Sequence, residues 1–269
     1  MIHATSAYLM PHPPIIVPAV GRDGLRRCAS TRQACAEVAA RVAAIAPARL
    51  VLVSPHAPRL AKAAAVFATS RISGSLARFG AAGARVDLPN DLDLVSRLTA
   101  AGRPFGPVEA PLDHGGLVPL WDLADAGWAG PTAVVSLPGR ADRDELRRQG
   151  EALGAALGAL PGPIVLIASG DMSHRVTPGA PAGYDPRAVG FDLTVRDLVA
   201  AGDLDGLFEL DDDLREAAAE DVIDPVLVVA SAIGFDARGA AVLSYEHPFG
   251  VGYLVAVLHE AGAAARGKS

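Results

Sequence analysis

Short runs of β-branched and other apolar residues alternate along this chain with longer stretches in which Ala and Leu have helical spacing. Apolar runs at 50–53, 133–136 and 164–168 predict strands, and helical stretches at 23–46 and 143–160 adjoin them. The 164–168 run is apolar on both faces, which is typical of a strand inside a sheet. Alternating strands and helices form sheets with helices on both faces. The pattern predicts an α/β fold, a three-layer α/β/α sandwich around a central mixed, largely parallel sheet.

The C-terminal third has its own pattern, mostly helical and then extended. Helices are expected at 185–201, 204–210, 213–219 and 225–233, and a strand pair at 240–245 and 251–257. A chain of 269 residues, 51% of them hydrophobic, can bury one large core or two small ones. No segment marks a convincing boundary, so we expect a single catalytic domain spanning residues 1–269.

Charge and cysteine content narrow the class of protein. A net charge of -6 without long charged runs argues against binding to nucleic acid or to an anionic membrane surface. No apolar run approaches the roughly 20 residues of a membrane span, and the N-terminus lacks the features of a secretory signal, so we expect a cytoplasmic protein. Cys28 and Cys35, seven apart in a predicted helix, are too distant to bridge and are expected to be small buried hydrophobes. A small-molecule partner is the expectation.

Five of the seven histidines stand in loop-like sequences with proline, glycine or acidic neighbours. They are His12 in Met-Pro-His-Pro-Pro, His56 in Ser-Pro-His-Ala-Pro, His114 in Asp-His-Gly-Gly, His174 in Ser-Gly-Asp-Met-Ser-His, and His247. His12, His56 and His174 each follow a predicted strand, and ligands of open α/β sheets bind beyond the carboxyl ends of the strands. One such histidine is usually a hydrogen-bonded loop residue. Three together favour a metal site.

A carboxylate completes the candidate ligand set. Glu246 ends a predicted apolar strand, and two histidines with one carboxylate form the facial triad that leaves positions open on Fe(II). The same ligand types describe a catalytic zinc site, so iron and zinc both remain candidates. His247 directly follows Glu246 and could compete for the metal, although adjacent strand residues point to opposite faces.

Five motifs, in order and from end to end of the chain, resemble those of the class III extradiol ring-cleavage dioxygenases. This superfamily contains the protocatechuate 4,5-dioxygenase beta subunit and the Memo-type proteins. The motifs are 10–14, 54–58, 112–115, 169–174 and 246–253. Within this superfamily the chain resembles the uncharacterised bacterial and archaeal members that are often associated with an AMMECR-like domain and a radical SAM protein, and whose substrate is poorly defined.

The resemblance implies a non-haem Fe(II) dioxygenase of aromatic compound catabolism, which opens a catechol-type or aminophenol-type ring with O2. It implies that His12, His56 and Glu246 ligate the iron. His174 is then the catalytic acid/base, because an imidazole with a pKa of about 6.5 can take the diol proton and return it. His114 orients the substrate, or is simply a loop histidine that begins a helix.

The resemblance also leaves alternatives. Memo-type relatives have a cysteine at the third ligand position and roles outside ring cleavage, so the alternatives are a Memo-like metal-binding protein and a zinc-dependent hydrolase without ring-cleavage activity. A homo-oligomer or a partner subunit is expected as well.

Four further residues have two interpretations each. Asp171 either bonds a loop backbone or orients an imidazole. Arg78, in an apparent glycine-bounded loop at 73–80, either binds a substrate carboxylate or is an ordinary surface arginine, which is the commoner case. Tyr184 and Tyr253 either pack in the core or line the pocket.

Overall fold

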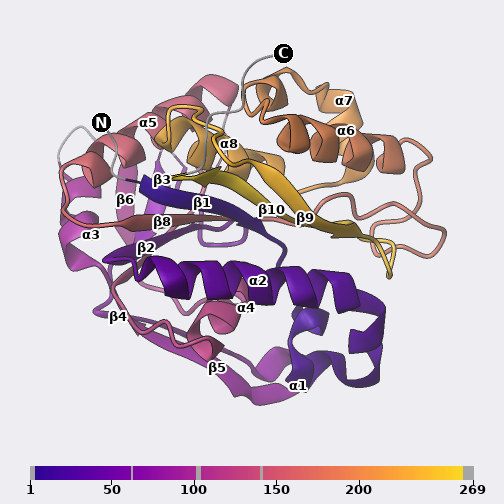
Figure 1. The fold of residues 1–269 in the computed structure, drawn as a ribbon, viewed down its shortest axis with the longest axis horizontal. Coiled ribbons are helices and arrows are strands. Elements are labelled where there is room, and N and C mark those ends of the chain that lie inside the picture. Colours follow the sequence, from indigo (N-terminus) through magenta and orange to yellow (C-terminus); the bar gives the residue numbers. More distant parts are fainter. Residues whose placement is uncertain (1–3, 62, 101–103, 140–141, 263–269) are drawn as a thin grey trace.

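The computed structural model describes residues 4–61, 63–100, 104–139 and 142–262. Within them, an eight-stranded sheet with the strand order β6-β3-β7-β2-β8-β1-β10-β9 forms the centre (Figure 1). Its strands are β1 (Ala4–Met10), β2 (Arg49–Val53), β3 (Ala64–Phe67), β6 (Phe105–Val108), β7 (Thr132–Val135), β8 (Ile164–Ser169), β9 (Ala241–Glu246) and β10 (Tyr253–Glu260). The neighbouring pairs β6–β3, β7–β2, β2–β8 and β8–β1 are parallel, whereas β3–β7, β1–β10 and β10–β9 are antiparallel. The sheet is therefore mixed and largely parallel.

Two layers cover the sheet (Figure 1). One layer contains α3 (Leu92–Leu98), α5 (Arg143–Gly158), α6 (Ala188–Ala201), α7 (Asp212–Ala218) and α8 (Ile223–Ala232), with the short turn η4 (Gly206–Glu209). The other contains α1 (Pro18–Gly21), α2 (Ala29–Ile45) and α4 (His114–Asp125), the turns η1 (Pro14–Ile16) and η2 (Arg22–Cys28), and a hairpin of β4 (Arg71–Leu76) and β5 (Ala81–Pro89) joined by η3 (Ala77–Phe79). The predicted α/β fold, a three-layer α/β/α sandwich, is confirmed.

Alternation along the central strands divides the core between these two layers. In β2, Val51 and Val53 belong to the hydrophobic cluster beneath α5 and α8, whereas Leu50 and Leu52 belong to the cluster beneath α2 and α4. Successive side chains of a strand point to opposite faces, so a fully apolar run supplies both cores. This is why β2, β7 and β8 lack polar alternation.

The register of the three central strands places their carboxyl ends at one level. Ala168 of β8 lies opposite both Leu9 of β1 and Val53 of β2. All three strands run parallel, so the loops that follow them leave from the same edge of the sheet. These loops carry His12, His56 and His174.

The structure corrects two details of the expected elements. The helix expected at 23–46 is split into η2 and α2 near Cys28, and Gly24, a weak helix former, lies within η2. The expected loop at 73–80 is wrong, because this segment forms most of β4 together with η3. Burial alternates along β4, but its small polar residues do not resemble a strand. Cys28 and Cys35 are free and buried, as expected.

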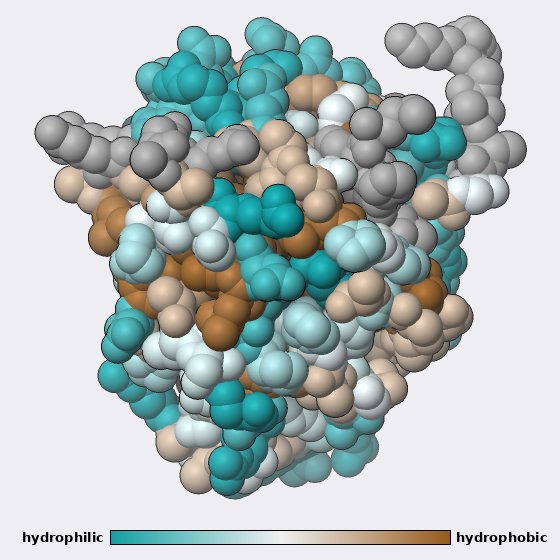
Figure 2. Space-filling view, turned by 90° about the vertical axis from the view of Figure 1, so that its left-hand side faces the viewer, coloured by the Kyte–Doolittle hydropathy of each residue, from teal (hydrophilic) through white to brown (hydrophobic). Residues whose placement is uncertain are grey.

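The outer surface is mixed in character. Figure 2 shows the face on the left-hand side of Figure 1, where hydrophilic side chains are interspersed with smaller hydrophobic groups. Among the described residues, no helix combines the length and the apolar character needed to cross a bilayer.

Candidate metal centre

Three of the histidines selected from the sequence converge beyond the carboxyl ends of the central strands. One ring nitrogen from each of His12, His56 and His114 lies within 4.8 Å of the other two. The Nε2 atoms of His12 and His56 are 3.1 Å apart, and the His56 and His114 rings stack with their centroids 4.5 Å apart. His12 is buried, whereas the side chain of His56 is 36% exposed. The cluster therefore has one deep and two more accessible imidazoles.

A carboxylate that the sequence analysis did not select completes this cluster. Oδ2 of Asp221 lies 3.0 Å from Nε2 of His56 and 3.5 Å from Nε2 of His12. Ligand atoms at about 2.1 Å from one metal ion, at octahedral or tetrahedral angles, are about 3.0 to 3.4 Å apart. The spacing of these three donor atoms thus fits a shared metal ion. The only sequence signal at Asp221 is an acidic residue before an apolar helix, which usually indicates a helix start.

A hydrogen bond to Nδ1, the ring nitrogen that faces away from the cluster, fixes the orientation of the His12 ring. Nδ1 of His12 lies 3.0 Å from Oγ of Ser169, and that hydroxyl donates its single hydrogen to the carbonyl of Gly115 at 2.6 Å. The Ser169 oxygen must therefore accept a hydrogen bond from Nδ1–H of His12. This keeps the proton on Nδ1 and directs Nε2 into the cluster, as in many metal-binding histidines.

We predict that Ser169→Ala lowers metal affinity about 10- to 100-fold. Loss of a residue that hydrogen-bonds a metal-binding histidine typically has an effect of this size in metalloproteins. Titration of the metal-free protein with Co(II) would measure this. Ser231→Ala is the matched control, since the buried Ser231 hydroxyl has no hydrogen-bond partner among the described residues. An unchanged affinity in Ser169→Ala would show that the hydroxyl does not position the ring.

Asp171 connects the loop of His12 to Asp221. Its Oδ1 accepts a hydrogen bond from the backbone N–H of His12 at 2.9 Å, and its own N–H donates to Oδ1 of Asp221 at 2.7 Å. The N–H of Asp221 in turn donates to the carbonyl of Asp171. Of the two roles expected for Asp171, the structure shows the bond to the loop backbone.

The charged groups of the cluster shift one another's pKa values. Burial lowers the pKa of His12, but the carboxylates of Asp171 and Asp221 outweigh it and raise this pKa to about 9. Burial raises the pKa of Asp221, but His12 and His56 hold it well below its usual range. Burial and the neighbouring imidazoles lower the pKa of His114 to about 4. Near neutral pH the cluster thus holds an ionised carboxylate and a neutral His114, and a metal ion would replace the Nε2 proton of His12.

The structure does not bring Glu246 into this cluster. Its Oε1 accepts hydrogen bonds from the N–H of Thr31 at 2.8 Å and from the Thr31 hydroxyl at 2.6 Å. Thr31 lies in the first turn of α2, where backbone N–H groups lack helical partners. Glu246 therefore satisfies the start of α2, and its role as a metal ligand stays a prediction.

His174 lies in the loop after β8 and is held by its backbone. Its N–H donates to the carbonyl of Ala218, whereas its buried Nδ1 has no hydrogen-bond partner among the described residues. The preceding Ser173 N–H donates to Oδ1 of Asp192, whose Oδ2 accepts from the hydroxyl of Tyr245. The buried Asp192 thus fixes the loop that carries His174. His247 contacts Tyr245, with ring centroids 5.9 Å apart.

Burial raises the pKa of Asp192 to about 6. The folded state therefore favours the protonated Asp192 carboxyl. The stability that this protonated group contributes is fully present below the unfolded pKa of about 3.9, and it is lost as the pH rises through 6. Asp192→Asn keeps an acceptor for the Ser173 N–H but does not titrate. We predict that the stability of this variant relative to the wild type increases by about 2 to 3 kcal/mol as the pH is raised from 4 to 7. Urea unfolding across this range would measure the difference. A difference independent of pH would contradict the prediction.

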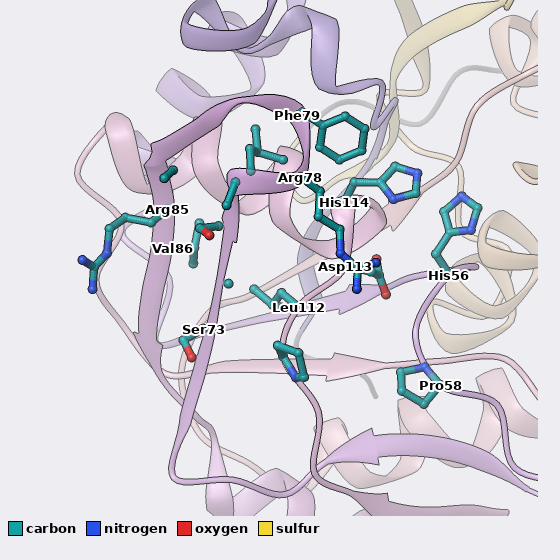
Figure 3. A pocket seen from close by; sticks show the side chains of 16 residues that line it. His56, Pro58, Ser73, Arg78, Phe79, Arg85, Val86, Leu112, Asp113 and His114 are labelled. Carbon is teal, nitrogen blue, oxygen red and sulfur yellow. The ribbon is translucent and has the colours of Figure 1, made fainter.

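A cavity of about 900 Å³ opens beside the exposed imidazoles. His56, Asp113 and His114 line one side, and β4, η3 and β5 form the facing wall (Figure 3). Arg78 lines this cavity. Of its two interpretations, the structure thus fits that of a pocket residue. Tyr253 is instead buried in the core, and Tyr184 is 55% exposed outside the cavity lining.

Comparison with known proteins gives the family. Residues 6–256 match the family model described as the catalytic LigB subunit of aromatic ring-opening dioxygenase. The chain belongs to this family. The resemblance drawn from the five motifs is thereby confirmed.

Two other proteins resemble the chain over most of its length. Protein CA_C1420 of Clostridium acetobutylicum is 32% identical over 261 residues, which cover 91% of this chain and 55% of that protein. The chain thus spans about half the length of this curated relative. The crystal structure of the uncharacterized protein JW3007 from Escherichia coli K12 has the same fold, with a TM-score of 0.64 at 17% identity, over 95% of this chain and 100% of that chain. The family match and the histidine cluster agree in marking a candidate metal site at this edge of the sheet.

Proposed function

We propose that this chain, as a single catalytic domain, opens a catechol-type or aminophenol-type ring with O2 at a non-haem iron(II) ion. The observation that carries the proposal is the convergence of His12, His56 and Asp221, whose donor atoms lie 3.0 to 3.5 Å apart. Two imidazoles and one carboxylate form a set that holds iron on one side and leaves the other side open. LigB family membership supports the same chemistry.

In this proposal His12 and His56 bind the metal through Nε2, and Asp221 supplies the carboxylate. Glu246, the carboxylate expected from the sequence, is the alternative third ligand. An iron(II) ion held by these residues would supply the electronic coupling between the diol and O2. The protein supplies the rest, namely a fixed ligand geometry, a cavity and groups that move protons.

Two other histidines act on the substrate. His114 stacks on His56 beside the cavity, and its lowered pKa keeps it neutral, so its ring can orient a substrate hydroxyl as donor or acceptor. His174 is the acid/base, which takes a proton from the diol and returns it later. The backbone bond to Ala218 and the support from Asp192 hold its loop.

The presence of a third imidazole favours one other candidate. His12, His56 and His114 also form a His3 set of the kind that holds catalytic zinc and leaves one position for water. A zinc-dependent hydrolase is therefore the second candidate, and a Memo-like protein that binds metal without ring cleavage is the third. Association as a homo-oligomer or with a partner subunit stays a prediction.

Oxygen uptake separates these candidates. Protein loaded with iron(II) without oxygen is given a panel of catechols and aminophenols, and its metal content is measured on the same sample. We expect uptake that is absent with zinc, and absent in His174→Ala although the metal stays bound. Tight metal binding without uptake for any diol would contradict ring cleavage.

A further inference from the structure

The turn η3 presents an arginine to the cavity. Arg78 extends from this turn toward Asp113 and His114 (Figure 3). The next residue, Phe79, has its ring centroid 5.8 Å from that of His114. The turn therefore lies against the accessible side of the histidine cluster, with a guanidinium and an aromatic ring at the cavity wall.

The guanidinium of Arg78 forms no hydrogen bond and no ion pair with the described residues. Arg71 of the same hairpin, in contrast, pairs with Asp87. The carboxylate of Asp113, nearest to Arg78 in Figure 3, caps α4 by accepting from the N–H of Gly116. Arg78 thus offers its donors to the cavity.

The hairpin that carries Arg78 is fixed to the site. The N–H of Leu112 donates to the carbonyl of Ser73 at 2.8 Å. A Cβ at Gly74 would meet the Leu112 side chain at 2.8 Å and its carbonyl at 2.9 Å, so β4 packs directly on the segment that leads into His114. The backbone of η3 is therefore held at a set distance from the histidines, and Arg78 extends from a rigid support.

We propose that Arg78 binds an anionic substituent of the substrate, a carboxylate or a phosphate ester on the aromatic ring whose diol faces the histidines. This inference rests on the proposed function for the identity of the ring, but the anion site itself needs only the cavity. A planar guanidinium binds either anion through two parallel hydrogen bonds. Arg85, on β5, lies at the far end of the same cavity and points away from the histidines in Figure 3.

Ligand-observed NMR and calorimetry on the metal-free full chain test the anion site without turnover. The probes are benzoate, phenyl phosphate and the neutral benzyl alcohol. We expect one of the two anions to bind about 10- to 100-fold more tightly than the alcohol, and Arg78→Gln to remove that advantage. The tighter anion identifies the substituent. Arg78→Lys should recover part of the binding, because it keeps the charge but not the two parallel bonds.

The controls are two variants that each remove one positive charge, as Arg78→Gln does. Arg85→Gln removes a charge from the same hairpin, and Arg97→Gln removes an exposed one on α3. Both should keep the preference for the anion. An unchanged preference in Arg78→Gln, or an equal loss in Arg85→Gln, would overturn the assignment. Failure of the proposed function is distinct, because oxygen uptake would then be absent while the dependence on Arg78 remains.

Discussion

Asp221→Asn is expected to weaken metal binding by more than about hundredfold, because loss of a merely supporting residue already costs 10- to 100-fold. The asparagine Oδ1 can still accept the N–H of Asp171, so the loop remains in place. The amide nitrogen, however, would face His56, and it is a poor metal ligand. His56→Ala should have a similar effect with little cost in stability, since the His56 side chain is 36% exposed. Calorimetric titration with Co(II) and metal analysis after dialysis would measure both.

Glu246→Gln is the matched comparison for Asp221→Asn. A glutamine keeps the acceptor that bonds Thr31, so α2 should be undisturbed. With Asp221 as the ligand, Glu246→Gln retains its metal. The opposite pattern, with metal lost in Glu246→Gln and kept in Asp221→Asn, would restore the carboxylate expected from the sequence and refute Asp221.

Gly170→Ala is expected to lower the free energy of unfolding by about 1 to 3 kcal/mol, the usual cost of overpacking. A Cβ at Gly170 would meet Cα of Val222 at 2.4 Å and the carbonyl of Asp221 at 3.1 Å. Backbone cannot rotate away as a side chain does, so the segment between α7 and α8 must move. Because this segment carries Asp221, metal affinity should fall together with stability. Urea unfolding of the metal-free protein and Co(II) titration would measure the two effects separately.

Gly190→Ala is the control for a glycine without a close neighbour. Nothing lies within 4 Å of a Cβ at Gly190, which is in α6. This variant should be unchanged or up to about 1 kcal/mol more stable, because alanine is the better helix former. Equal stabilities of the two variants would contradict the close approach at Gly170.

The layered fold could be predicted because its evidence is local. A buried parallel strand needs apolar residues on both faces, and 164–168 satisfies this in the sequence itself. The β4–β5 hairpin could not be predicted in this way. Its half-buried Gly74 lies against Leu112 and Leu117, which are distant in sequence, and this small residue fits that contact rather than a strand pattern.

The candidate site, like the fold, could be predicted only where its evidence is local. His12 and His56 were found because each follows a strand, and parallel strands end at one edge. Asp221 was missed because only the close approach at Gly170 and the two bonds to Asp171 bring it to the histidines. Glu246 was selected because it ends a strand, yet its carboxylate satisfies the start of α2. A strand end predicts where a residue lies, but tertiary contacts decide what it bonds.

Anomalous diffraction at the iron edge, from crystals of protein loaded with iron(II) without oxygen, tests the metal centre most directly. We predict a single peak in contact with Nε2 of His12, Nε2 of His56 and the carboxylate of Asp221. A peak bound by Glu246 in place of Asp221, or no peak at the histidines, would contradict this account of the site.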